Sequence, residues 1–192
     1  MNQKKRLIIA MTGATGAVYG VRMLQVLREQ SDWESHLVIS SSGLVNLKHE
    51  MDISRATLYA LADIVHGIDD IAASIASGSF KTEGIIIAPC SMKTLAAVAH
   101  GFGDNLISRG ADVALKERRR VVLMPRETPL HLGHIRNMAA VTEMGGIIFP
   151  PMPVFYHKTN TIAAMVDETV GRVLDMFGVD VSGLYKPWDG LG

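Results

Sequence analysis

The sequence predicts a three-layer α/β fold, with helices on both faces of a doubly wound, mainly parallel sheet of the Rossmann or flavodoxin-like kind. Two observations predict it: five short apolar runs recur along the 192 residues, and segments with helical spacing separate them. The runs are near-continuous rather than alternating, which is typical of strands covered on both faces, as in a parallel sheet. Strands that alternate with helices form such a sheet through right-handed crossovers.

The elements follow one another in a regular order. Strands are predicted at Leu7–Met11, His36–Ser40, Gly84–Ala88, Val121–Met124 and Gly146–Phe149. Apolar residues at helical spacing predict helices around Gly20–Leu27, Met92–Ala99, Ile107–Ala114 and Ile162–Phe177. The stretch Met51–Ser79 carries two weaker helical patterns and no clear strand, and Pro150–Pro153 is a rigid extended connection.

Composition narrows the class of protein. No linker or repeat divides the chain, so we expect one domain over residues 1–192, with 184–192 as a tail on the surface or against a neighbouring subunit. Because 48% of the residues are hydrophobic and 20% are charged, long disorder is excluded. The formal net charge is zero, so no basic field attracts a nucleic acid. The single cysteine indicates the cytoplasm, and no apolar run is long enough for a signal peptide or a membrane span.

The carboxyl ends of the predicted strands are unusually polar. Ligands of open α/β sheets bind at this edge. The residues that follow the strands include a glycine-rich turn, a run of serines, a hydroxyl-rich helix start and a charged pair, at Gly13–Gly16, Ser40–Ser42, Cys90–Thr94 and Arg126–Glu127. An edge of this kind is suited to a phosphorylated ligand.

The turn Gly13–Gly16 leads from a strand into a helix, whose free N–H groups can bind a phosphate. Taken alone, it is equally consistent with a plain strand-to-helix turn. A dinucleotide fingerprint has a third glycine where this chain has Tyr19, and an acid at the end of the second strand, where this chain has serines. The pattern therefore favours a phosphate or a flavin over a nicotinamide cofactor.

Two reactive groups lie at this edge. Cys90 precedes a helix, which lowers a thiol pKa, but no histidine lies near it in the sequence, so a small buried cysteine is the favoured interpretation. Arg126 and Glu127 are held between two prolines at a strand end. An arginine there can clamp a phosphate and a glutamate can transfer a proton, so a functional role is favoured for this pair.

Other candidate residues are weaker when taken singly. Arg109 and Lys116 share a helix face, for which a solvated, salt-bridged surface is the simpler explanation. Arg172 lies four residues after Glu168, so an ordinary ion pair within the helix is slightly favoured. Tyr156 follows a proline-rich strand end, where its phenol can bind a phosphate oxygen. No grouping of histidine, cysteine and carboxylates indicates a metal site.

Taken together, the motifs resemble the flavin prenyltransferases of the UbiX/Pad type. The resemblance runs through nearly the whole chain in order, in MTGATGAVYG, VISSS, APCSMKTLAAVAHG, DNLISRGADVALKERRRVVLMPRETPL, the MAAVTEMGGIIFPPMPVFYHK run and VGRVLDMFG. The blocks CSMKTLA, ADVALKERR and PRETPL are specific, whereas the glycine-rich turn is not.

The resemblance implies an activity. Members of this family join the dimethylallyl group of dimethylallyl monophosphate to reduced FMN at N5 and C6 without a metal. They pass the prenylated FMN to a UbiD-type decarboxylase and assemble as dodecamers. Release of phosphate from an allylic ester builds negative charge that arginine and lysine stabilise, which agrees with the cations noted above.

The resemblance also implies site residues. The FMN site would contain Gly13, Ala14, Thr15, Ser40, Ser91, Met92, Lys93, Thr94 and Arg126. The prenyl phosphate would be held, partly across subunits, by Arg109, Lys116, Tyr156 and Arg172. Glu50 and Glu127 would assist proton transfer. Thr15 replaces the serine often found at its position, which keeps the hydroxyl on a stiffer side chain.

Two alternatives from other classes stay open at this point. One is an FMN-dependent enzyme like the cysteine decarboxylases, but the catalytic histidine after the first helix and the asparagine motif of those enzymes cannot be placed in the sequence. The other is a non-catalytic flavin carrier. The cations Arg109, Lys116 and Arg172 have no purpose in a carrier, and an assay for phosphate release separates the two.

Overall fold

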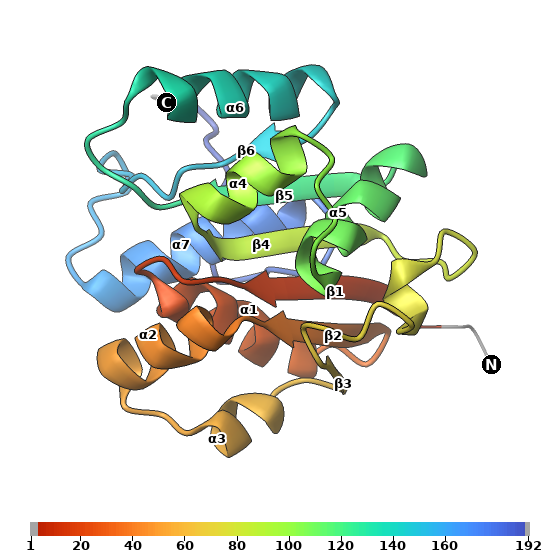
Figure 1. Cartoon of the computed structure of the whole chain (residues 1–192). Coiled ribbons are helices and arrows are strands. Elements are labelled where there is room, and N and C mark those ends of the chain that lie inside the picture. Colours follow the sequence, from red (N-terminus) through yellow and green to blue (C-terminus); the bar gives the residue numbers. More distant parts are fainter. Residues whose placement is uncertain (1–3, 191–192) are drawn as a thin grey trace.

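The computed structural model describes residues 4–190 and contains a six-stranded parallel sheet in the order β3-β2-β1-β4-β5-β6 (Figure 1). The strands are β1 Lys5–Met11, β2 Trp33–Ile39, β3 Ile64–His66, β4 Gly84–Cys90, β5 Arg120–Pro125 and β6 Ile147–Ile148. Successive strands are added outward from β1 on one side and then from β4 on the other, so the strand order switches between β1 and β4. In such sheets, ligands bind beyond the carboxyl ends of the strands at this switch point. The predicted fold class is confirmed.

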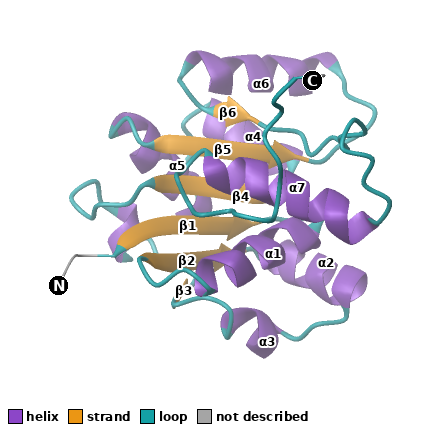
Figure 2. Cartoon of the chain, turned by 180° about the vertical axis from the view of Figure 1, so that it is seen from behind, coloured by secondary structure: helices purple, strands orange, loops and turns teal. Residues whose placement is uncertain are grey.

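Helices cover both faces of the sheet (Figures 1 and 2). They are α1 Ala17–Arg28, α2 Ser41–Met51, α3 Arg55–Tyr59, α4 Met92–Ala99, α5 Leu106–Lys116, α6 Leu132–Glu143 and α7 Ile162–Asp175, with a 3-10 turn, η1, at Ser74–Ala76. Buried side chains of α1, α2, α3 and α7 form one core, and those of α4, α5 and α6 form the other. The four predicted helices correspond to α1, α4, α5 and α7.

The two cores explain why the strands are apolar along their whole length. In β1, Leu7 and Ile9 point to the core under α1 and α7, whereas Ile8 and Ala10 point to the core under α4 and α5. All four are at most 2% exposed. Because successive side chains of a strand point to opposite faces, a strand buried on both sides needs apolar residues at every position.

One strand differs from the sequence-based expectation. β3 lies within Met51–Ser79, where no clear strand is predicted, between α3 and η1. It is three residues long and pairs with a single neighbour, β2, so that Ile64 faces His36. Ile64 is 38% exposed. A short edge strand with partly exposed side chains produces no apolar run, so its sequence carries no strand signal.

A polar network lies beneath this edge of the sheet. His36 is fully buried, and its Nδ1 lies 2.9 Å from Nε2 of His66 while its Nε2 lies 3.0 Å from Oε1 of Glu34. Glu34 also accepts a 2.8 Å hydrogen bond from Arg6. Burial lowers the pKa of His36 and of His66 below the ordinary value, although Glu34 and Asp63 act in the opposite direction on His36. The folded protein therefore holds both imidazoles neutral.

We expect the free energy of unfolding to fall as the pH drops below the ordinary histidine pKa. The unfolded chain then binds protons that the folded network excludes, so the stability contributed by the neutral pair is present above that value and lost below it. Urea unfolding at about pH 7.5 and about pH 5.5 measures the loss. The double variant His36→Gln with His66→Gln cannot titrate there, and an equally large loss in that variant would contradict the assignment.

Candidate active site

The loops after β1, β2 and β4 enclose the first of three cavities at the carboxyl edge of the sheet. This serine cavity has a volume of about 240 Å³ and is lined by Thr12, Gly13, Ser40, Ser42, Ile68, Ser91, Lys93, Thr94, Asn105 and Ile107. The predicted residues Gly13, Ser40, Ser91, Lys93 and Thr94 are thus brought together. Ala14 and Met92 adjoin this group in the chain but are not among the lining residues.

Hydrogen bonds fix the walls of the serine cavity. Ser40 caps α2 by accepting from the N–H of Gly43 at 3.0 Å, and Ser91 caps α4 by accepting from the N–H of Thr94 at 3.3 Å. The Thr12 hydroxyl donates to the Pro89 carbonyl at 2.8 Å and accepts from the N–H of Ser91 at 2.8 Å. The cavity therefore lies where helix N-termini and hydroxyls meet, which is an arrangement that binds anions.

A close approach explains the glycine at position 13. A Cβ atom there would lie 2.4 Å from Cβ of Ser42, which no side chain can tolerate without movement of the backbone. The absence of a side chain keeps the loop after β1 close to the N-terminal turn of α2. The serine cavity depends on this contact for its shape.

The second cavity lies beside the loop after β5. It has a volume of about 290 Å³ and is lined by Thr15, Pro125, Arg126, Glu127, Thr128, Pro150, Pro151 and Met152. Nε of Arg126 is buried, and within residues 4–190 it has no hydrogen-bond partner. A buried guanidinium N–H without a partner is costly unless a ligand accepts from it. Arg126 therefore fits the predicted role of a ligand-binding residue.

Glu50 comes to this edge in an unexpected way. Its Oε2 accepts hydrogen bonds of 2.9 Å from the N–H groups of both Gly16 and Ala17. Gly16 has a φ of 101°, a conformation that glycine adopts readily. The N–H groups at the start of α1, which the sequence offers to a phosphate, are thus bound by a carboxylate instead. A carboxylate therefore occupies these donors in this structure, whereas the N-terminal turns of α2 and α4 line the serine cavity.

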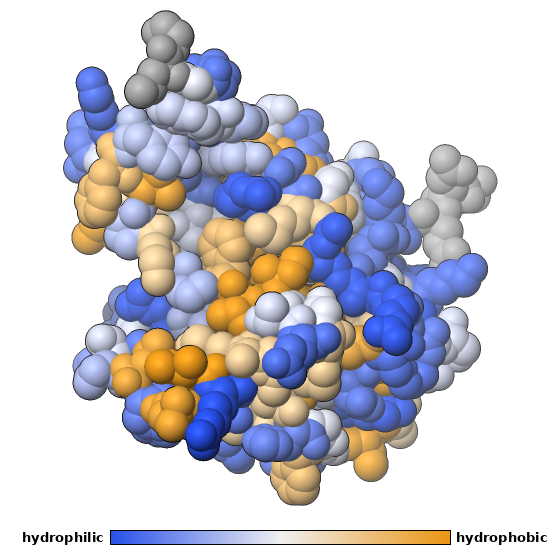
Figure 3. All heavy atoms as spheres, turned by 90° about the horizontal axis from the view of Figure 1, so that it is seen from above, coloured by the Kyte–Doolittle hydropathy of each residue, from blue (hydrophilic) through white to orange (hydrophobic). Residues whose placement is uncertain are grey.

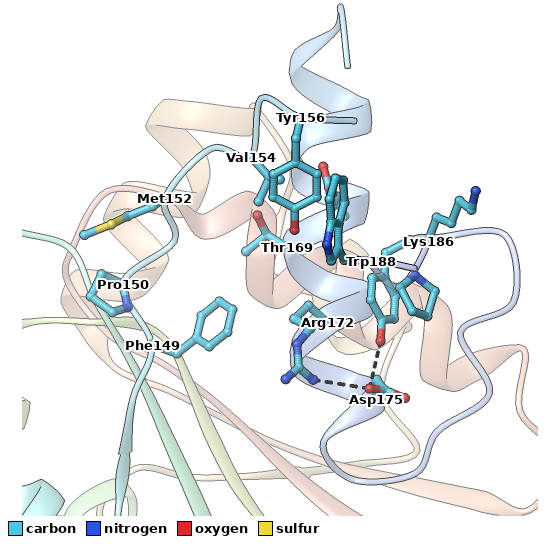
Figure 4. A pocket seen from close by; sticks show the side chains of 13 residues that line it. Phe149, Pro150, Met152, Val154, Tyr156, Thr169, Arg172, Asp175, Lys186 and Trp188 are labelled. Carbon is cyan, nitrogen blue, oxygen red and sulfur yellow. Dashed lines mark hydrogen bonds and ion pairs between the residues drawn. The ribbon is translucent and has the colours of Figure 1, made fainter. Parts of the chain in front are cut away.

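The third cavity, which we call the aromatic cavity, combines aromatic and aliphatic walls with charged side chains. It has a volume of about 510 Å³ and is lined by Phe149, Pro150, Met152, Val154, Tyr156, Glu168, Thr169, Arg172, Asp175, Tyr185, Lys186, Pro187 and Trp188 (Figure 4). Pro150 and Met152 also line the second cavity, so the two adjoin. Tyr156 and Arg172, which were predicted to hold a phosphate, lie in this one space.

The ion pair predicted between Glu168 and Arg172 is wrong. Arg172 donates to Asp175 at 3.2 Å, and the Tyr185 hydroxyl donates to the same carboxylate at 2.9 Å, as the dashed lines in Figure 4 show. Burial and Asp175 raise the pKa of Tyr185, so its phenol keeps the proton that it donates. Glu168 pairs with His157 instead. Helical spacing permits Arg172 to pair with either Glu168 or Asp175. Because the loop before α7 brings His157 to Glu168, Arg172 pairs with Asp175.

The tail after α7 supplies residues that the sequence analysis missed. Tyr185, Lys186 and Trp188 line the aromatic cavity, and the Trp188 ring packs edge-on against Tyr156 at a centroid distance of 5.1 Å. Residues 184–192 were expected to lie on the surface or against a neighbouring subunit, and of these, residues 191–192 lie outside the described part of the chain. A tryptophan in a tail rich in proline and glycine is the signal that points to such a role, because tryptophan is enriched at contact surfaces.

Arg109 and Lys116 do not join the other predicted phosphate ligands within one chain. Arg109 pairs with Asp112 at 2.7 Å and Lys116 pairs with Glu117 at 2.5 Å, as a solvated helix face predicts. Their helix, α5, packs on the opposite face of the sheet from α7, which carries Arg172. A site that uses both sets of cations therefore needs a second copy of the chain.

Metal and membrane sites were also sought within residues 4–190. No group of three or more histidine, cysteine, aspartate or glutamate side chains lies together in that range in a way that could hold a metal ion. None of its helices is both long enough and apolar enough to cross a membrane.

Comparison with known proteins decides the family. The family model described as Flavoprotein matches residues 1–175. Proteins described as flavin prenyltransferase UbiX from Neisseria meningitidis serogroup B and Escherichia coli K12 are 54% and 51% identical over 187 residues. These alignments cover 97% of this chain and 98% and 99% of the two relatives.

The chain belongs to the flavin prenyltransferase family.

Solved structures agree with this membership. A crystal structure of AnUbiX (PadA1) in complex with FMN and dimethylallyl pyrophosphate matches with a TM-score of 0.95 and 50% identity, over 99% of this chain and 100% of the other. A dodecameric FMN-dependent UbiX-like decarboxylase from Escherichia coli O157:H7 matches with a TM-score of 0.93 and 48% identity, over 96% and 100%. The FMN-dependent cysteine decarboxylase TvaF matches at 0.59 with 18% identity over 75% of this chain and 88% of that chain, a likeness of fold alone.

No histidine lies near Cys90 in the sequence to act as its base, and we expect Cys90→Ala to keep most of its turnover. Cys90 is fully buried, and burial raises the pKa of its thiol far above the ordinary value, so it stays protonated. Loss of the buried sulfur is expected to cost about 1 kcal/mol of stability. Turnover and the Tm of the variant measure both effects, and complete loss of turnover in a folded, FMN-bound variant would contradict the assignment.

Proposed function

We propose that the chain transfers the dimethylallyl group of dimethylallyl monophosphate to N5 and C6 of reduced FMN, which yields prenylated FMN and inorganic phosphate. The observation that carries this proposal is the series of three cavities along one edge of the sheet. The serine cavity suits an anion, the second contains an arginine N–H without a partner, and the aromatic cavity combines apolar walls with cations. The solved relative that holds FMN and a dimethylallyl ester in one complex supports the same pairing of ligands.

The flavin site is proposed to run from the serine cavity to Arg126. Gly13, Ala14, Thr15, Ser40, Ser91, Met92, Lys93, Thr94 and Arg126 form it. Bound reduced FMN supplies the nucleophilic N5 and C6 atoms and a π face for the allyl group. The residues of the chain contribute position: the caps of α2 and α4 hold the phosphate end, and Arg126 donates to an acceptor at the other end.

The prenyl phosphate is proposed to lie in the aromatic cavity. Tyr156 and Arg172 donate to the phosphate, and Arg109 and Lys116 reach it from a neighbouring subunit. Donors aimed at the leaving phosphate stabilise the negative charge that develops as the C–O bond breaks. Apolar walls such as Phe149 and Val154 keep water from the allyl group.

Glu127 and Glu50 are proposed to transfer protons. Glu127 lines the second cavity, which adjoins the aromatic one, and is exposed. Its Oε1 accepts from the N–H of Thr128 at 3.0 Å, which orients the carboxylate. Closing a ring at C6 requires removal of a proton from that carbon, and a carboxylate at this edge can accept it.

Assembly and partner complete the proposal. We propose a homododecamer that works in the cytoplasm and passes prenylated FMN to a UbiD-type decarboxylase. Figure 3 shows apolar side chains gathered in patches on the face that is seen from above. On α6, Leu132 and Ile135 are 58% and 51% exposed. Exposed apolar patches of this kind mark surfaces between subunits. The single cysteine, which cannot form an internal disulfide, supports the cytoplasm.

The proposed function is tested by mass spectrometry of the flavin. The protein is incubated without oxygen with reduced FMN and dimethylallyl monophosphate, and parallel samples contain the diphosphate ester or no protein. We expect the mass of the flavin to increase by that of one dimethylallyl group. We also expect one phosphate to be released for each flavin that is modified. A flavin carrier binds FMN and releases no phosphate, whereas a cysteine decarboxylase acts on a peptide thiol and leaves the flavin mass unchanged.

A further inference from the structure

Glu168 is a buried carboxylate whose hydrogen bonding is incomplete. It lies on α7 and is 6% exposed. Its Oε1 makes a short contact with Nδ1 of His157, and its Oε2 is buried without a hydrogen-bond partner among the described residues. A buried carboxylate with a single partner depends strongly on that partner. The pairing with His157 is therefore the principal interaction of the Glu168 carboxylate.

The pair connects a loop to a helix. Residues 150–161 join β6 to α7 and contain no helix or strand. Other hydrogen bonds recorded for 150–160 stay within the loop, as from the N–H of Lys158 to Phe155 and from Thr159 to Val154. In the part of the chain that the structure describes, Thr161 caps α7 at the end of this loop, and His157 to Glu168 is the hydrogen bond that joins the rest of the loop to α7. It therefore determines where the loop lies along the helix.

The hydrogen bond between His157 and Glu168 also bears on the position of Tyr156, which directly precedes His157. The Tyr156 ring packs edge-on against the His157 ring at a centroid distance of 4.3 Å and an angle of 80°. On its other side it meets Trp188, and it is 57% exposed. An exposed tyrosine on an irregular loop has a defined position only if its neighbours are fixed. His157 is fixed by Glu168, whereas Trp188 lies in the C-terminal tail.

Glu168 also separates two spaces. It lines the aromatic cavity together with Tyr156 and Arg172. On its other side it lines a further cavity of about 540 Å³, together with His157 and Asp167. The pair is thus part of the wall behind the proposed phosphate site, and it lies one turn of α7 before Arg172.

We propose that His157 and Glu168 are positioning residues that place the Tyr156 hydroxyl for the phosphate of the prenyl donor. This inference rests on the proposed function of the aromatic cavity. Glu168 holds His157, His157 holds the Tyr156 ring edge-on, and the phenol is thereby kept near Arg172. A displacement of about 1 Å in such a group is enough to weaken a substrate contact substantially.

Binding of the prenyl donor tests the inference without turnover. Dimethylallyl monophosphate is titrated calorimetrically into the protein loaded with oxidised FMN, which cannot accept the prenyl group. We expect His157→Ala to raise the Kd of the donor roughly three- to thirtyfold, which lies within the range of coupling between residues in contact, while the Kd of FMN stays unchanged. His157→Asn, whose amide can donate from near the position of Nδ1, should recover part of the loss.

A double-mutant cycle with Tyr156→Phe separates positioning from a general effect on folding. If His157 acts through the Tyr156 hydroxyl, His157→Ala weakens donor binding far less in the Tyr156→Phe background. Equal losses in both backgrounds, or a parallel loss of FMN binding, would overturn the inference. His100→Ala is the matched control, since His100 is exposed at the end of α4 on the opposite face of the sheet.

A second variant guards against misfolding. His157→Ala leaves a buried carboxylate without its partner, whereas His157→Phe combined with Glu168→Leu removes both partners together, which is far less destabilising. This folded double variant is expected to show the same weakened donor binding, and wild-type affinity in it would overturn the inference. If the wild-type protein itself fails to bind the donor, the proposed function falls and the inference falls with it. If the wild-type protein binds the donor, the variants test the inference alone.

Discussion

Replacing Arg172 by alanine is expected to lower kcat/KM for dimethylallyl monophosphate by about ten- to a hundredfold and to leave FMN binding unchanged. A charge-assisted hydrogen bond contributes about 1.5–3 kcal/mol, and each 1.4 kcal/mol corresponds to a factor of ten. If the guanidinium contacts the leaving phosphate, where charge grows as the C–O bond breaks, kcat falls as well as affinity.

The geometry favours this role over a structural one. Arg172 is half exposed on α7 and lines the aromatic cavity, and its recorded partner is Asp175, also half exposed. A surface pair of this kind contributes less than about 1 kcal/mol to stability. If Arg172 served only that ion pair, Arg172→Ala would hardly change kcat/KM. The cavity, rather than the ion pair, is what makes a large effect expected.

Steady-state kinetics with varied donor and saturating reduced FMN measure the effect. Arg172→Lys keeps the charge but loses the planar fork that binds two phosphate oxygens, so an intermediate loss is expected. Tyr156→Phe removes one neutral donor, and its loss should be smaller, about three- to tenfold. Arg28→Ala, in the exposed last turn of α1, is the control. An unchanged specificity constant in Arg172→Ala would falsify the phosphate role.

The fold could be predicted because its strands are buried on both faces. Runs such as Leu7–Met11 carry that signal in the sequence itself, and each predicted run has a strand in the sheet. β3 could not be found in this way, since three residues at a half-exposed edge produce no periodic pattern. The carboxyl edge was also predictable, because parallel strands bring all their following loops to one side.

Contacts between distant segments could not be predicted. Glu50 reaches the N–H groups at the start of α1 from more than thirty residues away, at separations of 34 and 33. Local sequence shows only a free helix N-terminus there. In the same way, helical spacing suggested that Glu168 pairs with Arg172, while the loop that carries His157 supplies a partner eleven residues away. Buried charges select the best partner in space, which spacing along one helix does not reveal.

The predicted phosphate ligands lie on opposite faces of the sheet, so we expect activity to depend on assembly of the subunits. Arg109 and Lys116 lie on α5, and Arg172 lies on α7, with the sheet between the two helices. One chain therefore cannot bring all three to one phosphate. We expect Arg109→Ala and Arg172→Ala each to abolish most of the activity alone, and oligomers that contain both variant chains to recover part of it.

The recovery follows from how a shared site is composed. In a mixed oligomer, some sites combine an intact α7 from an Arg109→Ala chain with an intact α5 from an Arg172→Ala chain. Random assembly of equal amounts gives roughly a quarter of sites with both residues intact, so roughly a quarter of wild-type turnover is expected. Co-expression with two different affinity tags, followed by purification on both, isolates the mixed species for assay.

A second mixture provides the matched control. Arg172 and Tyr156 line one cavity within a single chain, so co-expression of Arg172→Ala with Tyr156→Ala leaves no site with both residues intact. We expect no recovery in that mixture. Recovery in both mixtures would indicate exchange or contamination, and recovery in neither, with mixed oligomers present, would contradict a site shared between subunits. Because each cation alone is worth only a few kcal/mol, sharing the site across an interface makes turnover depend on assembly itself.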